Sequence, residues 1–210
     1  MMQPVPVVDL GGRYVGGEVA LTWSFPPGAP DTVYIIPVIG TGAAKRANPN
    51  EMTERPLRNV SAGMRFAYQN RSAHDVTRCE FLVFLGPGGE ALPNFASMIN
   101  NPAFTINVTV GRAHVYYWID TKSVEHGFDR HVLSLESSFS IEEGILGYSF
   151  SCGLQTYNVP FPNAIKRGKH KFMPFFTPQG SYIGVGIVDG ANAEITSEVR
   201  KIFKLPFMLG

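Results

Sequence analysis

The stretch EVALTWSFPPGAPDTVYIIPV, from Glu18 to Val38, determines which fold class the sequence predicts. Apolar and polar residues alternate from Glu18 to Phe25, and this period of two predicts a β-strand with one face turned to a core. The residues on the apolar face are Val19, Leu21, Trp23 and Phe25. Pro26-Pro27 ends the strand, and a second apolar run begins at Val33. Two such strands joined by a short proline-rich connection predict antiparallel β-structure.

Short alternating runs of the same kind recur along the chain. They are Cys79–Leu85, Thr105–Val110, His114–Asp120 and Ser181–Ile187, separated by clusters of Gly, Pro and Asn that are typical of turns. Asn94–Asn101 predicts a single helical turn, and Ile195–Leu205 fits a helix or a strand, of which a strand closing the last hairpin is favoured. The sequence therefore predicts an all-β fold of antiparallel β-sandwiches with very little helix.

The cluster Asn100-Asn101-Pro102 is the predicted boundary between two domains. About seven candidate strands precede it, as many as a seven-stranded sandwich needs, and a second series begins at Thr105. Each series carries a tryptophan in an early strand, Trp23 in the first and Trp118 in the second. We expect tandem β-sandwich domains at residues 1–101 and 102–210, each long enough to bury a core.

Two resemblances follow from these motifs. The run VALTWSFPPGAPDTVYI resembles the B and C strands of a fibronectin type III or immunoglobulin-like domain, with a core Trp, a proline-bearing crossing and a Tyr in the facing sheet. Together with VGRAHVYYWID, FDRHVLSL, ILGYSF and YNVPFPNAI, it is also similar to a group of short bacterial all-β proteins over nearly the whole chain. The resemblance implies a fold and brings no catalytic assignment, so it transfers no function.

Composition limits the classes of partner and the expected location. Hydrophobic residues make up 44% of the 210 residues and charged residues 17%, which predicts a folded chain, and the formal net charge of +1 argues against binding to nucleic acid. We expect no secretory signal and no membrane span, and therefore a cytoplasmic location. The two cysteines, Cys79 and Cys152, are predicted to be reduced, buried thiols.

No set of residues predicts a particular reaction. A glycosidase needs two carboxyl groups across a cleft, but Glu142-Glu143 is the only adjacent acidic pair, and Glu80 is expected on a solvent face. His126 and His131 flank an expected hairpin connection, so a metal site is not favoured there. We expect no catalytic residue, no metal and no cofactor, and a non-enzymatic role is favoured over an enzymatic one.

Two groups of residues are candidates for binding. The first group lies on one face of an expected strand and consists of His114, Tyr116, Trp118 and Asp120. The other face of this strand, with Val115 and Tyr117, is expected to pack toward the core. An aromatic pair on the outer face would mark an interaction surface or a platform for a sugar. The basic patch Lys166, Arg167, Lys169 and Lys171 is followed by phenylalanines and is expected to dock an acidic protein partner.

These observations favour an interaction or assembly module with a protein partner. The first alternative is a carbohydrate-binding or carbohydrate-active protein that uses the aromatic strand face. The second is a structural component of a viral or injection-type assembly, since β-sandwiches serve as building blocks in such particles.

Overall fold

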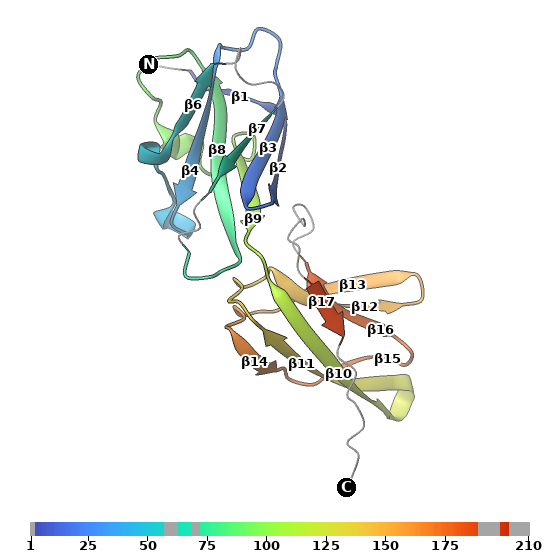
Figure 1. Cartoon of the computed structure of the whole chain (residues 1–210). Helices are drawn as coiled ribbons and strands as arrows, with labels where there is room; N and C mark the ends of the chain where they lie inside the picture. The colour runs from blue at the N-terminus through green and yellow to red at the C-terminus, as the bar shows by residue number, and fades with distance from the viewer. Residues whose placement is uncertain (1–2, 57–62, 69–71, 189–197, 202–210) are drawn as a thin grey trace. The chain divides into compact units, whose positions relative to one another are not determined.

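The computed structural model describes residues 3–56, 63–68, 72–188 and 198–201 (Figure 1). The chain divides into two compact units. Unit 1 comprises residues 1–69 and 78–110, and unit 2 comprises residues 70–77 and 111–210. The division differs from the predicted boundary after residue 101, because the strand Thr105–Val110 pairs within unit 1 and a segment preceding residue 78 belongs to unit 2.

Unit 1 contains two β-sheets. The larger sheet consists of β1 (Val5–Pro6), β8 (Thr77–Gly86), β4 (Thr32–Ile39), β5 (Arg46–Ala47), β6 (Thr53–Pro56) and β9 (Thr105–Val110). The smaller sheet consists of β2 (Val8–Val15), β3 (Glu18–Ser24) and β7 (Gly63–Ala67). The short helical turns among the described residues of this unit are η1 (Gly42–Ala44), η2 (Pro49–Glu51) and η4 (Phe95–Ser97). η4 lies within the predicted helical turn, and the Asn94 side chain at its start accepts a hydrogen bond from the Ala96 N–H.

The core of unit 1 explains why β3 alternates while β4 and β8 do not. Val19, Leu21 and Trp23 of β3 are buried against the larger sheet, and the residues between them face outward. On β4 and β8 both faces are covered: the second face, with Tyr34, Ile36, Leu82 and Phe84, packs against Met98 and the residues around it. Strands buried on both sides read as continuous apolar runs such as VYII and FLVFL.

Glu80 of β8 is not solvated as expected. Its carboxylate lies 2.6 Å from the amine of Lys45, and its side chain is 11% exposed. The burial arises because the second face of β8 is covered along most of its length. Lys45 thus supplies the positive charge that a half-buried carboxylate needs.

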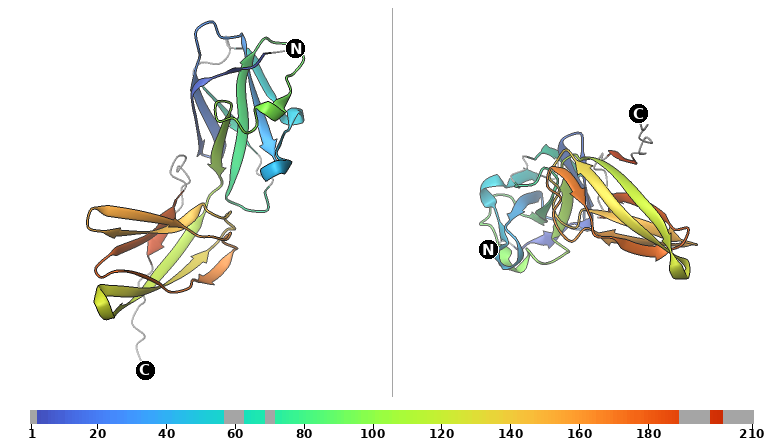
Figure 2. Two further views of the ribbon diagram at one scale, coloured as in Figure 1. Left: turned by 180° about the vertical axis from the view of Figure 1, so that it is seen from behind. Right: turned by 90° about the horizontal axis from the view of Figure 1, so that it is seen from below.

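Unit 2 also contains two sheets, seen from two further sides in Figure 2. One consists of β10 (His114–Val124), β11 (Phe128–Ser137), β14 (Gly168–Lys171), β15 (Phe175–Pro178) and β17 (Glu198–Lys201). The other consists of β12 (Leu146–Cys152), β13 (Gln155–Pro160) and β16 (Tyr182–Ile187). The turn η5 (Glu125–Gly127) closes the long β10–β11 hairpin. β17 pairs with β10 in parallel, while the other named pairs of this unit are antiparallel.

The core of unit 2 lies between these sheets. Its central residues are Val115, Leu133, Leu135, Ile145, Leu146 and Val185, all buried. Val76, from the segment that precedes β8, joins this core through a bridge to Ile141. Residues 72–77 are therefore a structural part of unit 2, although the chain continues from them into a strand of unit 1.

The all-β prediction is confirmed. The helical structure in the described part of the chain is limited to single 3₁₀ turns. Of the C-terminal segment 195–205, Glu198–Lys201 form the strand β17, and the remainder lies outside the described residues. None of the described helical turns is long and apolar enough to cross a membrane.

The cysteines behave differently from one another. Both are free thiols, and Cys79 is buried as expected. The prediction that Cys152 is buried is wrong: it is the last residue of β12 and is exposed. Its strand runs beyond the covered part of the sheet into a turn, so the apolar residues before Cys152 did not imply that it would be covered.

Candidate functional site

Unit 2 carries an aromatic pocket of about 550 Å³. It lies between residues 159–165, which include and follow the end of β13, and residues 170–175, which run from the end of β14 to the first residue of β15. The side chains that give the pocket its apolar character are Tyr148, Phe161, Phe172, Met173 and Phe175. A concave, mostly aromatic site of this volume is typical of sites that take up an apolar group.

A β-bulge forms one wall of this pocket. Lys171 pairs with Ser134, and pairing resumes where Phe175 faces His131. Residues 172–174 therefore lie opposite only residues 132–133, so one extra residue is accommodated. Pro174 has no N–H to donate to β11, which favours the interruption at this point. The bulge turns Met173 out to solvent, where it is 86% exposed at the mouth of the pocket.

The aromatic rings of the pocket are fixed by one another. Phe161 and Phe172 are stacked with ring centroids 4.3 Å apart, and Tyr148 and Phe175 are stacked at 4.4 Å. The Phe172 N–H donates to the carbonyl oxygen of Leu133 at 2.9 Å, which ties the bulge to β11. Burial raises the pKa of Tyr148 above its ordinary 10.0, in keeping with the position of its ring against the apolar wall of the pocket. The aromatic wall of the pocket is therefore preformed.

The predicted basic patch lies beside this pocket. All four of its residues, Lys166, Arg167, Lys169 and Lys171, are exposed, and Lys171 and its neighbour His170 line the pocket. The ring nitrogen Nε2 of His170 lies 2.6 Å from the carbonyl oxygen of Lys166, which folds the patch back on itself. The patch, called the basic rim below, places positive charge next to an apolar cavity.

Two carboxylates lie near the basic rim. Register places Glu136 opposite Lys169, and the charge of Arg167 helps to lower the pKa of Asp75, after the larger effect of hydrogen bonds from Ser140. Within the described residues, no ion pair joins Lys166 or Lys171 to a carboxylate. These two amines are consequently available to an incoming negative charge.

The predicted strand face and the basic rim share one sheet surface. Across the strands, Tyr116 faces Glu136 and then Lys169, while Trp118 faces Ser134 and then Lys171. Residues paired in this way project from the same face of a sheet. The sequence placed these groups at distant positions, and β11 brings them together.

Exposure along the predicted strand face is uneven. His114 and Asp120 are exposed, but Tyr116 and Trp118 are half-buried and do not form the fully exposed aromatic pair that was considered. Val115 and Tyr117 are buried, so the inward face was predicted correctly. Glu136 faces Tyr116, four residues along β10 from Asp120, or about 13 Å at strand spacing. The carboxyl groups of a glycosidase lie about 5–10 Å apart, so the two side chains would have to lean toward each other along the strand to meet that requirement.

His126 and His131 do not converge. His126 lies in η5 with its side chain 88% exposed, whereas His131 is buried between Thr121 and Thr177. In the part of the chain that the structure describes, no group of three or more His, Cys, Asp or Glu side chains is arranged to hold a metal ion.

Neither the pocket nor the burial of His131 was predicted from the sequence. The pocket depends on YNVPFPNAI and on the phenylalanines after the basic patch, whose proline content was the available signal. Nothing in the sequence indicated that these segments, from different sheets, would lie side by side. The buried environment of His131 also depends on strand pairing, because the residues that hydrogen-bond its ring lie on β10 and β15.

Comparison with known proteins gives no assignment. The chain matches no protein-family model and no curated protein. A functional conclusion therefore rests on the geometry of the described residues.

Proposed function

We propose that this protein is a non-catalytic interaction module, and that unit 2 takes an apolar side chain of an acidic partner protein into its aromatic pocket. The observation that carries the proposal is the position of the basic rim at the edge of that pocket. An apolar cavity selects an apolar group, and the adjacent lysines favour a partner in which that group is flanked by carboxylates.

The pocket and the basic rim contribute to binding in different ways. Removing a Leu or Phe side chain of the partner from water contributes about 1.5–3 kcal/mol, and the preformed rings lose little freedom on binding. The exposed lysines contribute mainly to the association rate and to salt dependence, because rim charges are screened by solvent. Met173, exposed at the mouth and flexible, can adapt to the bound side chain.

Fluorescence polarisation with labelled peptides tests the proposal. The probe is a short peptide with one Phe flanked on both sides by Asp, compared with a peptide that has Lys in place of Asp and one that has Ser in place of Phe. We expect saturable binding of the first peptide that weakens as salt rises, and much weaker binding of the other two. Equal binding of all three, or of none, overturns the proposal.

Variants locate the binding site. Met173→Ala should weaken the Phe peptide about fivefold, and Lys171→Glu about tenfold at low salt with a flatter salt dependence. The matched control for Met173 is Leu154→Ala, because Leu154 is a fully exposed apolar residue in the β12–β13 turn, away from the pocket lining. Loss of binding in the control as well would show a non-specific hydrophobic effect and would contradict the proposed site.

Carbohydrate binding is the second candidate. Its support is the placement of His114, Tyr116, Trp118 and Asp120 on one outer face of β10, where aromatic and polar groups alternate with the buried ones. A glycan array with the wild-type chain and with Trp118→Ala tests it: binding that Trp118→Ala abolishes favours a glycan, and an empty array removes this candidate.

Assembly into a larger particle, with both units as immunoglobulin-like or fibronectin type III-like building blocks, is the remaining proposal, for which light scattering of the purified chain is the first test.

A further inference from the structure

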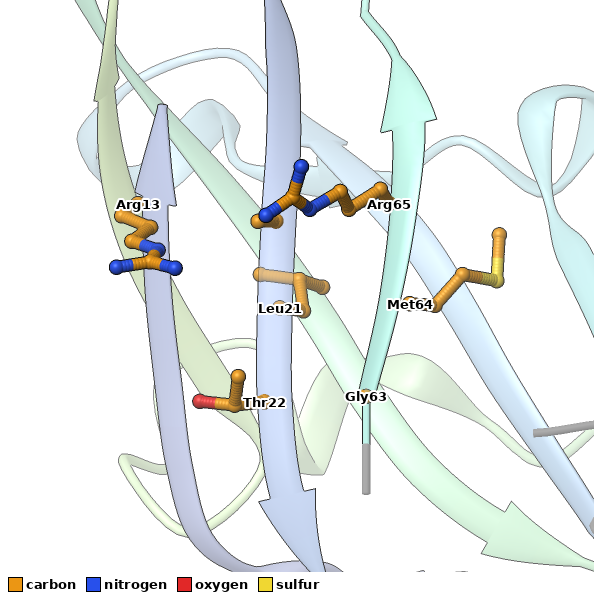
Figure 3. A pocket seen from close by; sticks show the side chains of 7 residues that line it. Arg13, Leu21, Thr22, Gly63, Met64 and Arg65 are labelled. Atoms are coloured by element: carbon orange, nitrogen blue, oxygen red, sulfur yellow. The ribbon is translucent and has the colours of Figure 1, made fainter. Parts of the chain in front are cut away.

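Unit 1 contains a shallow hollow on the outer face of the sheet formed by β2, β3 and β7 (Figure 3). Its volume is about 330 Å³. The residues that form it include Arg13, Ala20, Thr22, Gly63 and Arg65, each contributed by one of these three strands. Nothing in the proposed function of unit 2 uses it.

Strand register places two arginines on either side of an alanine. Arg13 of β2 pairs with Ala20 of β3, and Ala20 pairs in turn with Arg65 of β7. The three side chains therefore project from the same face. Figure 3 shows Arg65 extending from β7 across β3 toward the strand that carries Arg13. Ala20 is only 5% exposed although it faces outward, consistent with the arginine stems covering it.

The next row of the sheet makes the surface hollow. Thr22 lies between Gly11 on β2 and Gly63 on β7. A Cβ atom at Gly63 would lie 2.5 Å from the carbonyl oxygen of Leu21, so no larger residue fits there without movement. With glycine on both sides, the Thr22 hydroxyl is exposed beside the arginine row, and Figure 3 shows it on the face from which Arg13 and Arg65 project.

We infer that this hollow is a binding site for a small oxyanion, a phosphate or carboxylate group, held by Arg13 and Arg65 with the Thr22 hydroxyl as a further donor. A guanidinium presents a planar fork of N–H donors that matches both kinds of group in a bidentate manner. Two guanidiniums on one concave face raise the local positive potential, which attracts an anion. The shallow, exposed position of both arginines predicts weak, salt-sensitive binding.

Glu18 limits the affinity of this site. It is exposed on the same face, one row from Arg13 and Arg65, where it pairs with Val15 and Ala67. Its carboxylate competes for the guanidiniums with an incoming anion. Glu18→Gln is therefore expected to strengthen anion binding, which a merely structural role of the arginines would not produce.

Calorimetric titration of the full chain tests this inference. The ligands are inorganic phosphate, sulfate and succinate, each titrated into a buffer of about 0.01 M ionic strength, and sodium chloride titrated to the same final ionic strength is the blank. We expect saturable binding of at least one of them at one site. Tighter binding of phosphate and sulfate would identify a tetrahedral oxyanion as the natural group, and tighter binding of succinate would identify a carboxylate. Absence of saturable binding up to roughly 20 mM of every ligand overturns the site.

The variants distinguish the site from a general effect of charge. Arg13→Gln and Arg65→Gln should each weaken binding about tenfold and Thr22→Val about threefold, whereas Arg55→Gln should leave it unchanged. Arg55 is an exposed arginine of β6 in the same unit, outside the hollow. Equal losses in Arg55→Gln contradict the inference. Urea unfolding of each variant checks folding, and amide NMR shifts of Gly11 and Gly63 on adding phosphate report the site independently of affinity.

The same variants separate this inference from the proposed function of unit 2. Arg65→Gln should not alter binding of the Asp-flanked Phe peptide, and Lys171→Glu should not alter binding of phosphate. If the peptide also loses binding in Arg65→Gln, its carboxylates occupy the unit 1 hollow, which supports the anion site while contradicting the assignment of the peptide to unit 2.

Discussion

Asp75 and Ser140 bind each other reciprocally. The Asp75 N–H donates to the Ser140 hydroxyl at 3.0 Å, while the N–H and the hydroxyl of Ser140 donate to one carboxylate oxygen of Asp75 at 2.7 and 2.8 Å. Beside them, the Val76 N–H donates to the Ser140 carbonyl oxygen at 3.0 Å. These bonds attach Asp75 and Val76 to unit 2, although the chain continues directly from them into β8.

Ser140→Ala should destabilise unit 2 by about 1 kcal/mol, which is less than the usual value of about 1.5–3 kcal/mol for a hydrogen bond to a charged group, because Asp75 is exposed and its charge is screened by solvent. Hydrogen bonds from Ser140 lower the pKa of Asp75 below its ordinary 3.8. Their contribution is therefore present at neutral pH and is lost as the pH falls through the lowered pKa. Urea unfolding at neutral and strongly acidic pH measures both effects, with the exposed Ser138→Ala as control. An equal effect of Ser140→Ala at both pH values would contradict this account.

Unit 2 should lose stability as the pH falls below about 6.5, the ordinary pKa of histidine, because of His131. The hydroxyls of Thr121 and Thr177 lie 3.0 and 2.9 Å from its two ring nitrogens, and burial lowers its pKa while the charge of Asp129 opposes that change. The folded state thus holds His131 neutral, whereas the unfolded chain takes up a proton below pH 6.5.

NMR titration of the His131 ring and thermal unfolding between neutral and mildly acidic pH check this prediction. His131→Gln keeps a hydrogen-bonding side chain that cannot titrate, so it should flatten the dependence of stability on pH in this range. The exposed His126→Gln is the matched control and should leave the dependence unchanged. A His131 pKa at or above 6.5 in the folded chain would be incompatible with the prediction.

Gly111→Ala should destabilise the chain by roughly 2–4 kcal/mol. Gly111 has φ +106, a value that other residues rarely adopt, and a Cβ atom there would lie 2.1 Å from the carbonyl oxygen of Asp75. Gly153→Ala is the control, since Gly153 has φ +60 with open space around it and should cost only the backbone strain. Chemical denaturation compares the two variants. Equal destabilisation would show that the contact with Asp75 does not matter.

One thiol should react in the folded protein and two after unfolding. Cys152 is exposed and Cys79 is buried, and only an accessible thiolate reacts quickly with a disulfide reagent. Titration with such a reagent, with and without denaturant, counts the reactive thiols in the folded and the unfolded protein. Cys152→Ser should abolish the native reaction, whereas Cys79→Ser should leave it intact. Rapid native reaction of Cys79 would mean that the core around β8 opens readily.

The sequence predicted strands well where burial follows a local pattern. Glu18–Ser24 alternates because one face of β3 meets a core and the other is outward, and Thr105–Val110 is found with the bounds that its alternation indicated. Prediction failed where burial depends on a distant segment. Glu80 was predicted to be solvated, but Lys45 and the residues that cover β8 enclose it. Cys152 was predicted to be buried because apolar residues precede it, but its strand extends beyond the core.

The candidate site was predictable in its parts and not as a whole. The basic residues from Lys166 to Lys171 and the outer face of β10 were recognised from charge and alternation, but their meeting on one sheet depends on β11 pairing with both β10 and β14. The pocket requires the bulge at 172–174 opposite residues 132–133, which has no local signature beyond Pro174.

The sequence by itself determined that this chain forms β-strands with defined inner and outer faces, because side-chain direction in a strand alternates with every residue. Tertiary structure alone decided which strands became neighbours, and with that the pairing of Asp75 with Ser140, the enclosure of His131 and the positions of the two arginines across Ala20. The physical reason is that strand pairing joins residues far apart in the chain, and its register depends on the fit of whole faces rather than on any short stretch.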